Sequence, residues 1–218
     1  TLAEVVRLYG EAEDQSVARE AGPQEPPQNN LRYGWQRGPI EQNHVALGYH
    51  APGTLTDDAR ALEVLAAILS EGRASVLNQY MRDEKGLITS GSASLLAFHD
   101  LGYFEIDFES SRPQEAQIGV LAELENIKKY GVTGEALARA KTRIAQDHYH
   151  QIETVQGVAE ELAFYEALGD WKKSQADLRA IQKVTAQDIV RVAKQFLKSE
   201  NLSAFEYFPE APKAKVDW

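Results

Sequence analysis

The alternation of apolar and polar positions over residues 44–50, HVALGYH, predicts a β-strand. Val45, Leu47 and Tyr49 share one face, and the other face carries small or polar side chains. Pro52 follows the alternation and ends it, because proline cannot donate to a strand ladder. We therefore expect one strand here with a single buried face.

Apolar side chains then recur at helical spacing over residues 57–72, DDARALEVLAAILSEG. Thr54 or Thr56 can cap this helix, since a hydroxyl accepts from the free N–H groups of a first turn. The apolar stripe consists of Ala59, Leu62, Leu65, Ala66, Ile68 and Leu69. A shorter helix is expected at about 75–84, ending at Gly86.

Two segments after this helix predict an antiparallel hairpin. Residues 88–98 are small and polar at first and then apolar, and a turn with Asp100 and Gly102 follows. Residues 103–109 alternate sharply, which predicts one buried face. The inward side chains are Phe104, Ile106 and Phe108, and the outward ones are Glu105 and Asp107.

The remainder of the chain is mostly helical. Helices are expected at 114–131, 133–153, 156–170, about 171–181 and 185–198, with a last strand at 201–209. Thr133 and Thr185 are the expected N-caps, and Ile118, Leu121 and Ile127 form the expected apolar stripe of the first of these helices. Strands and helices are partly segregated, which predicts an α+β fold with an antiparallel sheet and helices packed on one face.

The first 38 residues differ from the rest. Residues 2–9 read as a short amphipathic helix, and residues 11–30 are polar, acidic and proline-rich, which is typical of a linker. We therefore divide the chain into a tail helix of a preceding domain plus a linker, residues 1–38, and a domain over residues 39–218.

Composition narrows the functional classes. The 218 residues include 33 acidic and 23 basic side chains, a formal net charge of -10, and the basic residues form no stripe of the kind that binds nucleic acid. No apolar run approaches the roughly 18 residues of a membrane span. The chain has no cysteine, which excludes disulfides and thiolate zinc sites. The compartment stays open, with the bacterial cytoplasm and periplasm both compatible, because Thr1 is not an initiator Met.

Metal ligands are sparse in the sequence. No H-x-x-E-H, H-x-x-x-H or inverted motif is present, and His148 and His150 point about 200° apart on a helix. Asp147, His150 and Glu153 do share one helix side, so a metal there is one alternative to a solvated surface. We expect no metal in this chain.

Residues 80–94, YMRDEKGLITSGSAS, hold the remaining candidates. The small side chains of 89–94 fit an edge strand that another backbone approaches, or a groove wall for an extended peptide. Arg82 fits either a surface arginine beside acidic neighbours or a guanidinium that hydrogen-bonds a substrate carbonyl. Residue spacing leaves both alternatives open for 89–94 and favours the surface arginine for Arg82.

The order of segments resembles the insulinase/pitrilysin-type zinc metallopeptidases, which include the mitochondrial processing peptidases and the bc1 core subunits. The resemblance covers residues 39–208, with VALGYHAPG, TDDARALEVLAAILSEG and SVLNQYMRDEKGL followed by a strand pair and paired long helices. LAEVVRLYG and GPQEPPQ resemble the end of one family domain and its connector to the next. Because H-x-x-E-H is missing, the chain resembles the second, motif-less domain.

The resemblance carries expectations about fold, partner and site. It implies a clamshell half (the LuxS/processing-peptidase-like fold), with zinc held by an H-x-x-E-H domain upstream in the same polypeptide or in another subunit. It places Arg82 at a position that contacts the scissile carbonyl, Thr89 where relatives have tyrosine, and Val76 where many have arginine. The expected peptide-binding residues are Thr89, Ser90, Gly91 and Ser92.

Two functions follow from the resemblance. The first is the non-catalytic half of a zinc peptidase, which binds an extended peptide substrate, closes the chamber, and is inactive alone. The second is an inactive structural or assembly homologue, which Thr89 in place of tyrosine favours. A homo-oligomer is compatible with either function, and neither involves nucleic acid or a membrane span.

Overall fold

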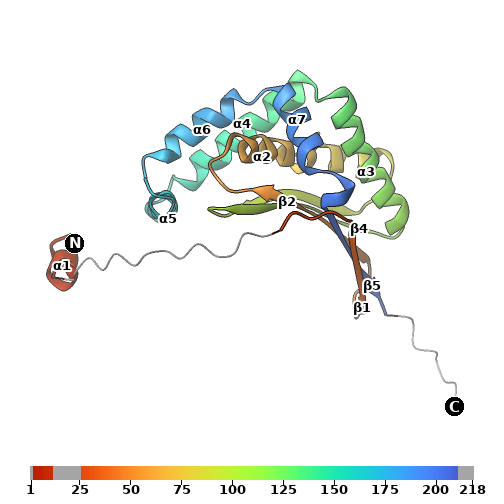
Figure 1. Cartoon of the computed structure of the whole chain (residues 1–218), viewed down its shortest axis with the longest axis horizontal. Coiled ribbons are helices and arrows are strands. Elements are labelled where there is room, and N and C mark those ends of the chain that lie inside the picture. The colour runs from red at the N-terminus through yellow and green to blue at the C-terminus, as the bar shows by residue number, and fades with distance from the viewer. Residues whose placement is uncertain (1, 12–25, 211–218) are drawn as a thin grey trace, which may run out of the picture.

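A computed structural model describes residues 2–11 and 26–210. Its five strands form one sheet in the order β1-β5-β2-β4-β3. Their bounds are β1 Arg32–Gly38, β2 Asn43–Pro52, β3 Ser90–Ala97, β4 Leu101–Ser110 and β5 Leu202–Pro209. Helices lie over one face of this sheet (Figure 1), so the predicted α+β class is confirmed.

The helices follow the predicted order closely. They are α1 Leu2–Tyr9, α2 Asp57–Ser70, η1 Val76–Glu84, α3 Pro113–Tyr130, α4 Gly134–Gln151, α5 Val155–Ala167, α6 Lys173–Lys183, α7 Ala186–Phe196 and the short η2 Ser199–Asn201. In the described ranges, no helix is both long and apolar enough to cross a bilayer.

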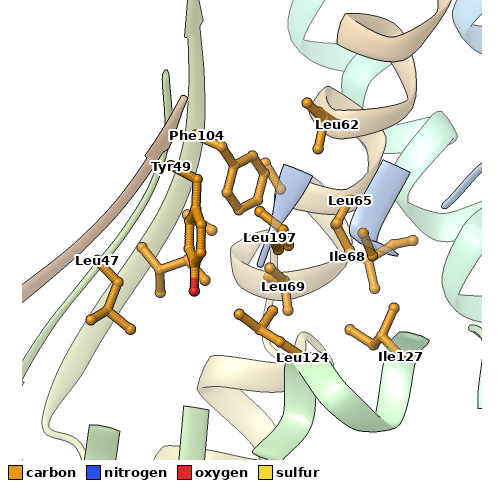
Figure 2. Close-up of a cluster of buried hydrophobic side chains, with 14 of the residues drawn as sticks. Leu47, Tyr49, Leu62, Leu65, Ile68, Leu69, Phe104, Leu124, Ile127 and Leu197 are labelled. Carbon is orange, nitrogen blue, oxygen red and sulfur yellow. The ribbon is translucent and has the colours of Figure 1, made fainter. Parts of the chain in front are cut away.

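One core joins the sheet to the helices (Figure 2). The predicted inward residues of the hairpin and of β2 are buried, as Phe104, Leu47 and Tyr49 illustrate, and Leu62 and Leu65 of α2 pack against that layer with no exposed surface. The nine buried residues of α2 include the whole predicted stripe. Burial of each large side chain contributes roughly 1.5–3 kcal/mol, so α2 anchors the fold.

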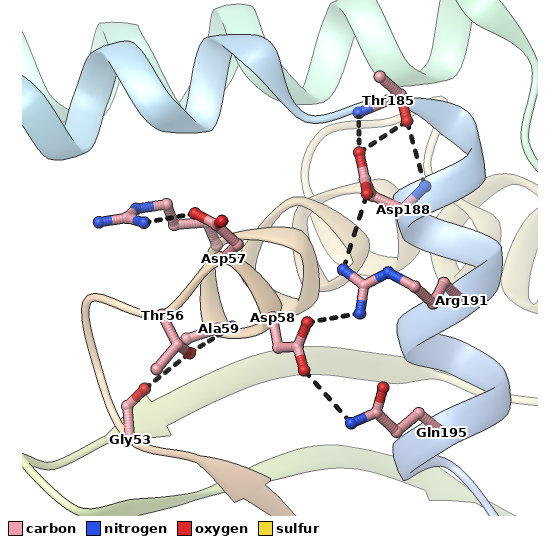
Figure 3. Close-up of polar contacts among 10 residues, drawn as sticks. Gly53, Thr56, Asp57, Asp58, Ala59, Thr185, Asp188, Arg191 and Gln195 are labelled. Carbon is pink, nitrogen blue, oxygen red and sulfur yellow. Dashed lines mark hydrogen bonds and ion pairs between the residues drawn. The ribbon is translucent and has the colours of Figure 1, made fainter.

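Polar contacts fix the start of α2 against α7 (Figure 3). The Thr56 hydroxyl accepts from the Ala59 N–H at 3.1 Å and thereby caps α2. Arg191 of α7 donates to Asp58 at 2.5 Å. The predicted capping box of α7 is present: the Thr185 hydroxyl accepts from the Asp188 N–H, and the Asp188 carboxylate accepts from the Thr185 N–H.

The expected stripe of α3 is wrong at one position. Ile118 is 69% exposed, and the core-facing side chains are Ala116, Val120, Leu124 and Ile127. Ile118 lies about 200° around the helix from Ala116, because each residue turns the helix by 100°. Packing against η1 and α7 buries this row, of which the sequence pattern singled out only Ile127.

The sheet contains one strand that the sequence analysis did not expect. β1 pairs parallel with β5, in a register that places Arg32 opposite Ser203 and Gly38 opposite Pro209. This strand lies within the range 1–38 assigned to a tail and linker. Most of the predicted linker, residues 12–25, lies outside the described residues, and the domain division stays a prediction.

The predicted helix at 75–84 is present as a π-helix. It ends at Glu84, and Leu87 N donates to Met81 O at 2.9 Å as the chain leaves it. Gly86 follows with φ 58°, a left-handed conformation that glycine adopts without steric cost. A π-helix such as η1 is uncommon, and π-helical turns are often found at functional sites.

Candidate functional site

Arg82 lies in the last turn of η1 and is held by its own helix. Its Nη1 donates to Asn78 Oδ1 at 2.7 Å, and its Nε donates to Asp83 Oδ1 at 2.9 Å. The side chain is 37% exposed, so part of the guanidinium faces solvent. These contacts orient the group without burying it, and they leave donors for a ligand because guanidinium carries five N–H groups.

Thr89 begins the segment predicted to bind substrate. Its hydroxyl donates to Gln42 Oε1 at 2.7 Å, and its N–H donates to the Glu109 carbonyl at 2.9 Å. The side chain is exposed but already engaged within the protein. Among the described residues, no hydrogen bond or ion pair connects Thr89 with Arg82.

Ser90, Gly91 and Ser92 lie on β3, which is an edge strand of the described sheet. Ser92 faces the side without helices and donates to the Asp107 carboxylate at 2.8 and 3.0 Å. A Cβ at Gly91 would approach Ile88 Cδ1 to 3.1 Å, so close packing accounts for this glycine. The small side chains leave the strand edge open to an approaching backbone.

The hydrogen-bond pattern shows which main-chain groups of β3 are free of β4. Phe98 N donates to Leu101 O at 2.7 Å, and bonded residues alternate along an antiparallel pair. Ala93 and Leu95 therefore direct their N–H and C=O groups away from β4. The Ala93 carbonyl accepts from the Ser70 hydroxyl at 3.1 Å, which agrees with this assignment.

The metal-binding alternative on α4 finds no support. Asp147 forms an ion pair with Arg143 at 2.9 Å, while His150 pairs with Glu153 at 3.1 Å. In the described ranges, no three His, Cys, Asp or Glu side chains gather as a metal site requires. Asp147, His150 and Glu153 form a solvated surface.

A cleft of about 770 Å³ lies beside the inner side of β3, and the sequence pattern did not predict its polar centre. Its walls come from α2, α4, α5, α6 and residues 93–97 of β3. The polar centre combines Arg60 and Glu63 of α2, Tyr165 of α5 and Asp177 of α6. Arg60 Nε donates to Asp177 Oδ1 at 2.5 Å, and the Tyr165 hydroxyl donates to Asp177 Oδ2 at 3.0 Å.

Glu63 differs from its polar neighbours. Burial and the nearby Asp177 carboxylate raise the pKa of Glu63 to about 7, although the positive charge of Arg60 lowers this pKa in part. Burial also raises the pKa of Tyr165, and the Asp177 charge raises it further. No sequence motif joins these residues, because Glu63 and Asp177 are 114 positions apart (177 minus 63).

Comparison with known proteins gives consistent matches. The profile of the family described as "Peptidase M16 inactive domain" matches residues 4–144. The zinc protease PqqE of Helicobacter pylori is 28% identical over 164 residues, which cover 71% of this chain and 35% of that protein. An uncharacterized zinc protease of Mycobacterium bovis is 29% identical over 161 residues, covering 72% and 36%. The chain thus spans about a third of these relatives.

Solved structures show the same fold. A protease from Helicobacter pylori superimposes with a TM-score of 0.82 at 24% identity, covering 96% of this chain and 53% of that one. A peptidase M16 inactive domain from Pseudomonas fluorescens superimposes with a TM-score of 0.74 at 18% identity, covering 88% and 47%.

Proposed function

This chain belongs to the peptidase M16 inactive-domain family, and from that premise we propose that it closes the chamber of a zinc peptidase over a separate catalytic half. The catalytic half carries H-x-x-E-H and supplies zinc chemistry, and it lies either upstream in the same polypeptide or in another subunit. The described residues of this chain do not fit a zinc ion. Its own residues bind and orient the peptide.

The free edge of β3 is the observation that carries the peptide-binding part of this proposal. An extended peptide can add a strand to such an edge, with main-chain hydrogen bonds to the outward N–H and C=O groups of Leu95. The outward carbonyl of Ala93 is already taken by the Ser70 hydroxyl. The serine side chains at Ser90 and Ser92 are short enough to admit the side chains of the added strand. Thr89 and Gly91 complete the segment that we assign to peptide binding.

Arg82 is the residue that we assign to the scissile carbonyl. Its contacts with Asn78 and Asp83 hold the guanidinium at the end of η1, and its exposed part can donate to an oxygen of the peptide. Thr89 in place of tyrosine shortens the reach of the second group, so we expect this half to assist catalysis through Arg82 alone.

The test combines this chain with its H-x-x-E-H half and follows cleavage of a fluorogenic peptide. Arg82→Ala is expected to lower kcat/KM by about tenfold to a hundredfold, the usual effect of losing one charged donor at a reacting carbonyl. Arg139→Ala is the matched control, since Arg139 is a 46% exposed arginine on α4 that pairs with Glu135 of its own helix. Unchanged activity in Arg82→Ala would refute the assignment, and zinc-dependent cleavage by this chain alone would refute the division of labour.

The second function, a structural or assembly homologue, is favoured by the engaged hydroxyl of Thr89. The two functions differ in one measurement. A structural homologue forms a complex with its partner half but yields no peptide cleavage, with or without added zinc.

A further inference from the structure

The cleft beside β3 contains one carboxylate that has neither a hydrogen-bond partner nor a close ion pair among the described residues, although the Arg60 charge acts on it from a distance. Glu63 lies on the core side of α2, is mostly buried and lines the cleft. In the part of the chain that the structure describes, it makes no hydrogen bond and no ion pair. Solvent still reaches its carboxylate oxygens, because no fully buried side-chain oxygen among the described residues lacks a hydrogen-bond partner. A mostly buried carboxylate of this kind favours a bound cation or a bound proton.

The cations near Glu63 are already committed to other acids. Arg60 binds Asp177 and also donates to Asp57 at 2.8 Å. Arg143 lies between Asp147 and Glu71 at 2.9 and 3.6 Å. The charged and titratable side chains around the cleft come from four helices and one helix cap. They are Arg60 and Glu63 of α2, the α2 C-cap Glu71, Asp147 and His148 of α4, Glu160, Glu161 and Tyr165 of α5, and Asp177 of α6.

The remaining acids of α5 are satisfied locally. Glu161 accepts from the Ser174 hydroxyl and faces His148 Nδ1 at 3.5 Å. Glu160 accepts from Gln156 at 2.8 Å. Six carboxyl groups thus line the cleft, together with one arginine and one histidine. Glu63 is the carboxyl group with which a cationic ligand could pair.

The shape of the cleft selects among cationic ligands. Its volume of about 770 Å³ holds several residues of a peptide. One wall is the β3 segment that includes Leu95, whose main-chain groups point away from β4. Ala66, Ala67 and Leu178 supply apolar surface that fits the methylene stem of a long side chain.

We propose that this cleft binds the lysine or arginine side chain of an extended peptide that pairs with β3, with Glu63 as the counter-ion. This inference rests on the proposed peptide-binding function and deepens it by naming the side-chain class. The charged head is drawn to Glu63, and the peptide backbone follows the free strand edge. The same ammonium group on a small diamine lacks the backbone and should bind more weakly.

Proton linkage gives the site a pH signature. With its pKa near 7, Glu63 is mostly protonated at pH 6 and mostly ionised at pH 8. Binding of the lysine side chain requires the ionised form, so affinity should rise about tenfold between pH 6 and pH 8. The Glu63→Gln variant should show no such rise.

The experiment titrates the full chain with acetyl-Thr-Val-Thr-Lys-Thr-Val-Thr-amide by calorimetry at pH 8. The matched probe replaces Lys by Gln, and a third probe carries N-methyl groups at alternate residues. The Lys peptide should bind about tenfold or more tightly than the Gln peptide, as expected for a charge-assisted contact. Glu63→Gln should abolish this preference, while Glu123→Gln, on α3 away from the cleft, should keep it.

The outcomes separate the inference from the proposed function. Equal binding of the Lys and Gln peptides overturns the side-chain assignment but leaves edge pairing intact. Unchanged binding of the N-methylated probe overturns edge pairing itself. Putrescine binding as tightly as the Lys peptide overturns the role of β3, and a retained Lys preference in Glu63→Gln overturns the role of Glu63. Circular dichroism of each variant verifies that it is folded.

Discussion

The helices α2 and α5 belong to the same layer but differ in how they are held. α2 buries nine of its fourteen residues against the sheet and α7. α5 buries only Gly157, and its apolar side chains Val155 and Phe164 are 90% and 50% exposed. The first helix is a packed scaffold, and the second is a thinly supported wall.

The difference divides the molecule into a rigid part and an adaptable part. Core packing around α2 fixes the position of Glu63, because a helix buried on most of its surface cannot shift without opening cavities. The α5 wall contacts mainly α6, so it can move at small cost. A cleft between two such parts keeps one side of a ligand site constant while the other adjusts.

The largest expected effect is a cavity in the scaffold. Leu65→Ala, at a position with no exposed surface, should lower the free energy of unfolding by about 3 kcal/mol through lost burial and the cavity left behind. Urea denaturation followed by circular dichroism measures the change. A loss below about 1 kcal/mol would show that α2 is not the anchor that its burial indicates.

Glu63→Gln should stabilise the protein in a pH-dependent way. Because the folded pKa of Glu63 lies near 7, above its ordinary value of 4.5, the ionised wild-type residue costs stability above pH 7, and that cost disappears below pH 4.5. The variant should therefore gain about 2 kcal/mol at pH 8 and little at pH 4.5. Denaturant midpoints across this window test the sign, and a gain independent of pH would contradict it.

Loss of the α7 cap should have a smaller effect. Thr185→Ala removes the hydroxyl that accepts from Asp188 N and should cost about 1 kcal/mol. Thr185→Ser keeps the hydroxyl and serves as the control in the same thermal melts. Equal melting temperatures for the two variants would argue against the capping box as a stabilising contact.

The smallest effect is expected on α5. Leu162→Ala, at a side chain 40% exposed, should change stability by less than about 0.5 kcal/mol. The same leucine-to-alanine change in α2 and α5 thus makes a matched pair. Comparable losses at Leu65 and Leu162 would remove the distinction between scaffold and wall.

The sequence predicted most of the packed scaffold because periodicity reports burial. The stripe of α2 and the alternation of β4 were confirmed, since their apolar residues are also the buried ones. The sequence pattern did not predict β1, because two glycines and two arginines stand among the aromatic residues of RYGWQRG and interrupt the alternation of apolar and polar positions. Ile118 was misassigned because this large apolar side chain lies on the exposed side of α3.

The cleft could not be predicted from the same signals. Its central residues come from α2, α5 and α6, and each is an ordinary helix-surface residue in its own segment. Only the folded arrangement brings Tyr165 and Asp177 to Arg60 and leaves Glu63 unpaired. The candidate residues Arg82 and Thr89–Ser92 came from a family resemblance, and their roles stay predictions.

The place of β5 in the sheet affects how the chain is synthesised. β5 lies between β1 and β2, although it is the last strand to leave the ribosome. β1 therefore has no neighbour among the described strands until residues 202–209 have emerged, and its edge stays exposed until then. The sheet can therefore close only after residues 202–209 have been synthesised.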